Sequence, residues 1–170
     1  MVLLCMAVFV FERGLAGQPL THWYLKHDRG FRSFQLVTSL FCHQSYAHLS
    51  SNLFGLYVFG RATEEQVGGP SMVIAFLFCG VFANLVSLLR FRGRVASLGA
   101  SGAVFGLFVV ATLLKAQWDW RSLVEFFVLG QFALSQVRGE LLGPARPGVN
   151  STAHVAGALG GLLAYALVRR

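Results

Sequence analysis

Long apolar segments recur along this chain, and they constrain its fold more than any other feature of the sequence. Residues 70–89 and 151–168 are the clearest examples, since neither contains an Asp, Glu, Lys or Arg. Within a lipid bilayer only helices and closed barrels pair all their backbone groups, and runs this long and evenly apolar fit helices. Charged residues make up 12% of the chain, about half the share usual in soluble domains. The sequence therefore predicts an all-α integral membrane protein.

Six apolar segments emerge, and we expect a six-transmembrane-helix bundle that forms one domain over residues 1–170. The fourth segment is short, because it begins at Ser101 and ends near Leu114. At about 1.5 Å per residue it extends about 21 Å, whereas the hydrocarbon layer is about 30 Å thick. Ser101 is therefore expected to be recessed below the membrane surface, in a water-accessible cavity. The predicted helices cover residues 1–15, 47–65, 70–89, 101–114, 122–135 and 151–168.

Four polar residues of kinds that are rare inside membranes lie near the starts of the even-numbered helices. His48 and Asn52 belong to the second helix, Ser101 to the fourth and His154 to the sixth. These helices would run in the same direction, so the four side chains would lie at similar depth on one face. Residues of this kind at such depth are most often functional. The same helices carry small residues that let backbones approach closely, namely Gly102, Gly106, Gly157 and Gly161.

A serine and a histidine in contact at this depth would favour nucleophilic catalysis. A serine hydroxyl becomes a nucleophile when a neighbouring base takes its proton, and His154 is the candidate base for Ser101. The tetrahedral intermediate also needs hydrogen-bond donors for its oxyanion, and the Ser101 N–H, His48 and Asn52 are candidates. Taken alone, a serine before a glycine at a helix start is more often a helix cap. The spacing by itself does not prove that the two side chains meet.

Two other functions remain open at this point. His43, His48 and His154 would suit a zinc site, although no cysteine or carboxylate partner supports one. A transporter would show repeated halves with broken helices, and the sequence has no such repeat. We therefore expect neither a metal nor a cofactor. The net charge of +7 comes from basic residues between the apolar segments and not from one basic stripe, so we expect no nucleic acid as a partner.

Four short motifs follow one another in a fixed order along the chain. HQSYAHLSSN at residues 43–52 has the pattern H-x4-H-x3-N, and GRATE at residues 60–64 has the pattern G-x3-E. GASG at residues 99–102 surrounds the candidate nucleophile with small residues. AHVAGALGG at residues 153–161 has the pattern A-H-x2-G-x3-G. In this order the motifs resemble the rhomboid family of intramembrane serine proteases, and in particular the six-helix core of its bacterial members.

The resemblance implies a serine endopeptidase that cleaves the transmembrane helices of membrane-protein substrates within the lipid bilayer, in regulated intramembrane proteolysis. Ser101 would be the nucleophile and His154 the base of a catalytic dyad. The Ser101 N–H, His48 and Asn52 would form the oxyanion site. A catalytically silent, rhomboid-like binder of membrane proteins is the alternative. The active-site motifs would also include Gly99, Gly102 and His43.

The resemblance and the charge distribution imply opposite orientations of the chain in the membrane. The resemblance implies a bacterial inner membrane, with the active site opening toward the extracytoplasmic face. The distribution of Lys and Arg between the two faces points the other way under the positive-inside rule.

The family's first long loop usually carries a Trp-Arg pair before the histidine motif, where this chain reads Phe34-Gln35. The pair is structural in the family, so the resemblance implies that the difference affects the rigidity of this loop more than the chemistry.

Overall fold

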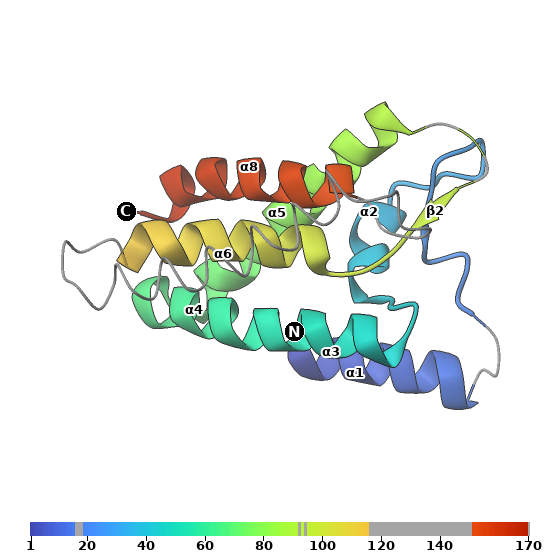
Figure 1. Cartoon of the computed structure of the whole chain (residues 1–170), viewed down its shortest axis with the longest axis horizontal. Helices are drawn as coiled ribbons and strands as arrows, with labels where there is room; N and C mark the ends of the chain where they lie inside the picture. The colour runs from blue at the N-terminus through green and yellow to red at the C-terminus, as the bar shows by residue number, and fades with distance from the viewer. Residues whose placement is uncertain (16–18, 92, 94, 116–150, 170) are drawn as a thin grey trace.

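The fold is mostly helical, as the apolar segments predicted (Figure 1). The structure is a computed structural model that describes residues 1–15, 19–91, 93, 95–115 and 151–169. The predicted helix at residues 122–135 lies outside this part of the chain, so the count of six helices stays a prediction. The helices are α1 (Val2–Val10), α2 (Gln35–Thr38), α3 (Tyr46–Gly55), α4 (Arg61–Val67), α5 (Gly69–Arg90), α6 (Ser101–Lys115) and α8 (Ser151–Val168), with shorter π- and 3-10 segments η1 (Phe11–Leu15), η2 (Ser39–Phe41) and η3 (Leu56–Gly60).

Several of these segments join into longer helices. The residues at the junctions of α1 with η1, of α3 with η3 and of η3 with α4 have right-handed helical backbone angles. Helical backbone therefore runs through α1 and η1, and again through α3, η3 and α4, where the sequence predicted helices at 1–15 and 47–65. Gly68 ends α4 with a φ of +82°, a conformation that favours glycine. Pro70 then opens α5 in its first turn, where the missing N–H costs nothing.

α5 is the one described helix that is long and apolar enough, by length and composition alone, to cross a membrane. It has 22 residues and a mean hydropathy of 2.4 over its most apolar window, and it extends about 33 Å. α6 and residues Thr152–Val168 of α8 are apolar but shorter. α6 has 15 residues and extends about 22 Å.

Large apolar side chains remain exposed along α1, α3, α5 and α8. The most exposed of them are between 58% and 81% accessible, which a soluble protein rarely shows over a contiguous surface. Lipid chains would cover such side chains in a membrane. Examples from each of these helices are Leu3, Phe54, Leu89 and Leu167.

α6 lies at the centre of the fold, packed against α5 and α8, and Figure 1 shows α8 lying along it. Small residues allow this approach. A Cβ atom built on Gly157 of α8 would overlap the carbonyl oxygen of Gly102 in α6, and a Cβ on Gly161 would lie 2.5 Å from the carbonyl oxygen of Gly106. The two backbones are therefore in direct contact, because nothing larger than hydrogen fits between them.

A two-stranded antiparallel sheet joins two loops at one end of the helices, and the sequence did not predict it. Its strands are β1 (Leu25–Lys26) and β2 (Ala96–Ser97). Leu25 pairs with Ser97, and Lys26 pairs with Ala96. The sheet connects the first long loop to the segment that enters α6, so it lies next to the start of that helix.

Candidate active site

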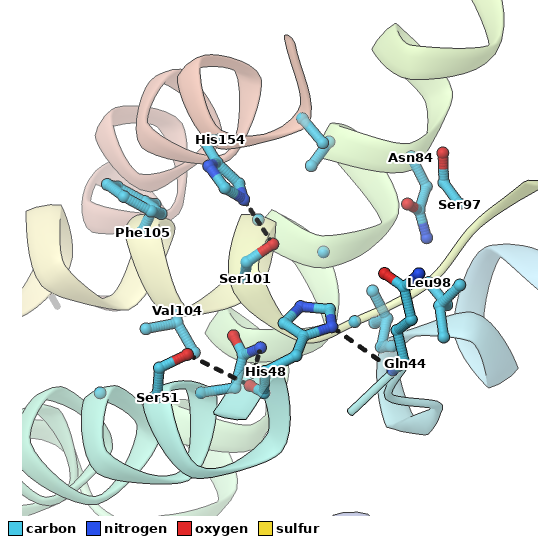
Figure 2. A pocket seen from close by; sticks show the side chains of 18 of the residues that line it. Gln44, His48, Ser51, Asn84, Ser97, Leu98, Ser101, Val104, Phe105 and His154 are labelled. Carbon is cyan, nitrogen blue, oxygen red and sulfur yellow. Dashed lines mark hydrogen bonds between the residues drawn. The ribbon is translucent and has the colours of Figure 1, made fainter. Parts of the chain in front are cut away.

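The structure brings together the side chains of Ser101 and His154. Ser101 begins α6, and His154 lies in the first turn of α8. His154 Nε2 is 2.6 Å from Ser101 Oγ, and Figure 2 shows the histidine reaching across from α8 to the serine. When Nε2 carries no proton, it accepts the serine hydroxyl hydrogen. The contact follows from the packing of α6 on α8, since the glycine stripes bring the first turns of the two helices side by side.

Aromatic packing fixes the plane of the His154 ring. Phe105, one turn into α6, stacks on it with 4.8 Å between ring centroids and 19° between ring planes. His154 is only 8% exposed, so the stacked face is shielded. The ring therefore has little freedom to rotate away from Ser101.

α3 contributes His48 and Asn52 to the same cavity. Ser45 caps this helix, and its hydroxyl accepts a hydrogen bond from the His48 N–H at 3.2 Å. Asn52 Nδ2 donates to the His48 carbonyl at 2.9 Å. An amide nitrogen carries two hydrogens, so one of them remains for another acceptor. The imidazole of His48 lies against Gly99, where an added Cβ would be 2.6 Å from Cε1.

These residues line one cavity of about 550 Å³ between α3, α5, α6 and α8. Its walls include Ser101, His154, His48 and Asn52 together with apolar side chains of all four helices. The cavity also reaches the loop before α6, including β2 and Gly99. A volume of this size can admit an extended peptide segment, because small-molecule pockets of similar size hold whole ligands.

His43 lies behind the cavity wall. It is 0% exposed, and its Nδ1 is 3.2 Å from the Phe41 carbonyl oxygen. Its ring meets the His48 ring edge-on at 5.2 Å. Burial, and secondarily the His48 ring, lower the pKa of His43 to about 4, so it is neutral at pH 7. His43 therefore supports His48 from behind and does not face the cavity.

The alternative of a zinc site depends on His43, His48 and His154. Among the described residues, no three His, Cys, Asp or Glu side chains come together in a way that could hold a metal ion. His154 is engaged with Ser101, and His43 is directed to a backbone carbonyl. The three rings therefore do not converge on one point.

Two polar features near the cavity were missed in the sequence. His27 Nε2 lies 2.8 Å from Ser97 Oγ. This is a second serine–histidine contact, and neither residue belongs to a motif that would predict it. Asn84 of α5 lines the cavity, and its Nδ2 donates to the Leu36 carbonyl at 2.9 Å and to Ser39 Oγ at 3.0 Å. Asn84 had a usable signal, because an amide within the apolar segment 70–89 is rare in membrane helices. His27 had none, since it lies in a polar loop.

Comparison with known proteins gives one consistent result. The family model described as the Rhomboid domain matches residues 31–170. Rhomboid-like protein 11, chloroplastic, of Arabidopsis thaliana is 40% identical over 95% of this chain and 61% of its own length. RHOMBOID-like protein 6, mitochondrial, of the same plant is 29% identical over 78% of this chain and 43% of its own length. Rhomboid protease GlpG of Klebsiella pneumoniae is 28% identical over 62% of this chain and 39% of its own length. The chain thus spans between 39% and 61% of the length of these relatives.

The relatives overturn the expected location in a bacterial inner membrane. The relative with 40% identity is named as a chloroplastic protein, and two further plant relatives are named as mitochondrial. The expectation of a bacterial inner membrane is therefore wrong. It transferred the location of bacterial members to this chain, and no residue of an apolar helix distinguishes a bacterial membrane from an organellar one.

Proposed function

The chain belongs to the rhomboid family, and we propose that it is an intramembrane serine endopeptidase with Ser101 as nucleophile and His154 as base. The observation that carries the proposal is the 2.6 Å separation between His154 Nε2 and Ser101 Oγ in the wall of a cavity. A relative at 28% identity, Rhomboid protease GlpG, is named as a protease. Substrates are transmembrane segments of membrane proteins, presented to the cavity as unwound peptide.

Catalysis follows the pattern of acyl transfer through a serine ester. Ser101 Oγ attacks the carbonyl carbon of the scissile peptide bond while His154 Nε2 takes the hydroxyl proton. The tetrahedral intermediate collapses, and His154 gives that proton to the leaving amine. A water molecule, deprotonated in turn by His154, then attacks the acyl ester. This attack forms a second tetrahedral intermediate. Its collapse releases the new carboxyl end, and His154 returns the proton to Ser101 Oγ.

The oxyanion of both tetrahedral intermediates needs fixed donors near Ser101. We assign this role to the Ser101 N–H at the start of α6, to the second hydrogen of Asn52 Nδ2 and to the imidazole of His48. The positive end of the α6 dipole adds to their effect. Removal of one such donor typically slows acyl transfer by about 100–1,000-fold. Gly99 serves this arrangement, since its missing side chain leaves room for the His48 ring.

The proposed architecture is a single domain of six transmembrane helices in which α6 is recessed. Its length of about 22 Å, against about 30 Å of hydrocarbon, supports this placement. Water then reaches Ser101 through the cavity, which hydrolysis requires. The proposed location is an organellar membrane, because of the chloroplastic and mitochondrial relatives.

Covalent labelling with a fluorophosphonate tests the proposal, because the reagent bonds only to an activated serine. We expect the detergent-purified chain to be labelled, and we expect Ser101→Ala and His154→Ala to lose labelling by at least about 1,000-fold. Ser50→Ala is the matched control, since the hydroxyl of this exposed serine donates to the Ala47 carbonyl of its own helix at 3.1 Å, and it should label like the wild type. Treatment with EDTA should have no effect.

Two results would decide against the protease. Labelling that persists in Ser101→Ala would remove the assigned nucleophile. A folded wild-type chain that no fluorophosphonate labels and that cleaves no membrane-protein substrate would favour the alternative, a silent binder of membrane proteins.

A further inference from the structure

A second serine–histidine pair lies next to the proposed dyad, and the chemistry above does not use it. His27 Nε2 is 2.8 Å from Ser97 Oγ, although 70 positions separate the two residues. Ser97 lines the cavity, whereas His27 is buried behind it at 6% exposure. The pair therefore joins the first long loop to the segment that leads into Ser101.

Backbone contacts reinforce this connection. His27 directly follows β1, which pairs with β2. The His27 N–H donates to the Val95 carbonyl at 3.0 Å, and the Gly93 N–H donates to the His27 carbonyl at 3.1 Å. The ring of His27 also packs edge-on against Phe91, with 6.0 Å between centroids. Both backbone groups and the side chain of His27 thus contact the segment before α6.

Gln35 holds the other side of β1. This side chain is 1% exposed, and its Oε1 accepts hydrogen bonds from the Lys26 N–H at 3.3 Å and the Arg32 N–H at 3.1 Å. Its Nε2 donates to the His22 carbonyl at 2.9 Å. One neutral amide therefore ties three points of the loop together. It does so at the position where the family usually carries the arginine of its Trp-Arg pair.

The segment between β2 and α6 is short and fixed at its middle. Three residues separate Ser97 from Ser101. The Gly99 N–H donates to the Ser39 carbonyl at 2.9 Å, and Ala100 is fully buried. A displacement of β2 would therefore move Ser101 by nearly the same distance. Catalytic geometry is sensitive to such movement, since a misplacement of about 1 Å can cost about 100-fold in rate.

We infer that Gln35, His27 and Ser97, here called the loop brace, are positioning residues that hold Ser101 at bonding distance from His154. Gln35 fixes β1, His27 connects β1 to Ser97, and Ser97 carries the constraint to the start of α6. Substrate would contact neither Gln35 nor His27, because both are buried outside the cavity. The inference rests on the proposed function, since it assigns what orients the proposed nucleophile.

The rate of fluorophosphonate labelling at saturating reagent tests whether the loop brace positions Ser101. We expect His27→Ala and Ser97→Ala each to slow labelling by about 10–100-fold, with the half-saturating concentration unchanged. The double variant should be no slower than the slower single variant, because the two residues act as a unit. Gln35→Ala should fall in the same range.

Conservative and control variants separate positioning from general damage. His27→Gln places an amide near the position of Nε2 and should recover most of the rate. His22→Gln changes an exposed histidine of the same loop and should label at the wild-type rate. Amide hydrogen exchange over residues 95–99 gives a readout that does not depend on activity, and His27→Ala should accelerate it.

Each contrary result overturns a different statement. Wild-type labelling rates in His27→Ala and Ser97→Ala, or additive losses in the double variant, would remove the brace while leaving the protease intact. Reagent found on Ser97 in the Ser101→Ala variant would make the second pair a nucleophile and not a brace. If the wild type itself is not labelled, the proposed function fails, and unchanged hydrogen exchange in His27→Ala would then overturn the brace independently.

Discussion

Gly99 shows at the scale of one residue why the proposed nucleophile motif contains small residues. Its φ is +118°, in the region that glycine adopts without strain. An added Cβ would also lie 2.6 Å from His48 Cε1 and 2.7 Å from His48 Nε2. The sequence predicted that Gly99 belongs to the active-site motif, but the identity of the neighbouring ring came only with the three-dimensional arrangement.

Gly99→Ala should therefore carry two costs. Backbone strain should destabilise the fold by about 1–3 kcal/mol. The clash should also push His48 out of the proposed oxyanion site, so labelling should fall by about 100-fold or more. Gly93→Ala is the matched variant, because Gly93 has the same φ of +118° but open space around it. Thermal unfolding should show similar destabilisation for both, whereas the labelling rate should be much lower for Gly99→Ala. Equal labelling rates would contradict the assigned role of the His48 contact.

At the scale of elements, the contact between α6 and α8 decides whether the side chains of Ser101 and His154 meet. The glycines of the two helices are spaced so that each backbone occupies the position of the missing side chains opposite. This packing was predictable, because small residues four positions apart form one stripe along a helix. β1 and β2 were not predictable, since strands of two residues carry no alternating pattern and their partners lie far apart in the sequence. The contact between His27 and Ser97 in the loop brace was not predictable either, because 70 positions separate the two residues.

Gly157→Ala tests the helix contact. The new methyl group would meet the Gly102 carbonyl and separate α8 from α6, which breaks the hydrogen bond between His154 and Ser101. We expect labelling to be lost, together with a lower thermal unfolding temperature. In Gly160→Ala, also in α8, the methyl group would meet the Phe82 ring at 3.1 Å, and this side chain can shift. That variant should retain most of the labelling, and comparable losses in both variants would show that helix separation is not the cause.

At the scale of the whole molecule, buried histidines link stability to pH. His43 is fully buried, and burial, followed by the neighbouring His48 ring, lowers its pKa from 6.5 to about 4. The pKa of His27 is also lowered, chiefly by burial. A group with a lowered pKa binds protons more weakly in the folded state than in the unfolded state. The contribution of neutral His43 to the free energy of unfolding is therefore complete above pH 6.5, and it is lost as the pH falls toward 4.

We expect the free energy of unfolding to decrease between pH 7 and pH 4, with roughly 3 kcal/mol of the decrease due to His43. Unfolding in detergent at several pH values measures the dependence. His43→Asn should flatten the curve in this interval. His22→Asn, which removes an exposed histidine, should leave its slope unchanged. A curve of the same slope in His43→Asn would show that this histidine is not the group that titrates.

The order in which the ribosome synthesises Ser101 and His154 has a consequence for the proposed dyad. Ser101 precedes His154 by 53 positions, so synthesis leaves an interval of about 3–10 s between them. During that time a nascent chain carries the Ser101 hydroxyl without His154, its proposed base. A chain terminated before α8 would also lack this proposed base. If the proposed dyad is correct, the chain therefore becomes able to cleave substrates only after the last described helix has been made.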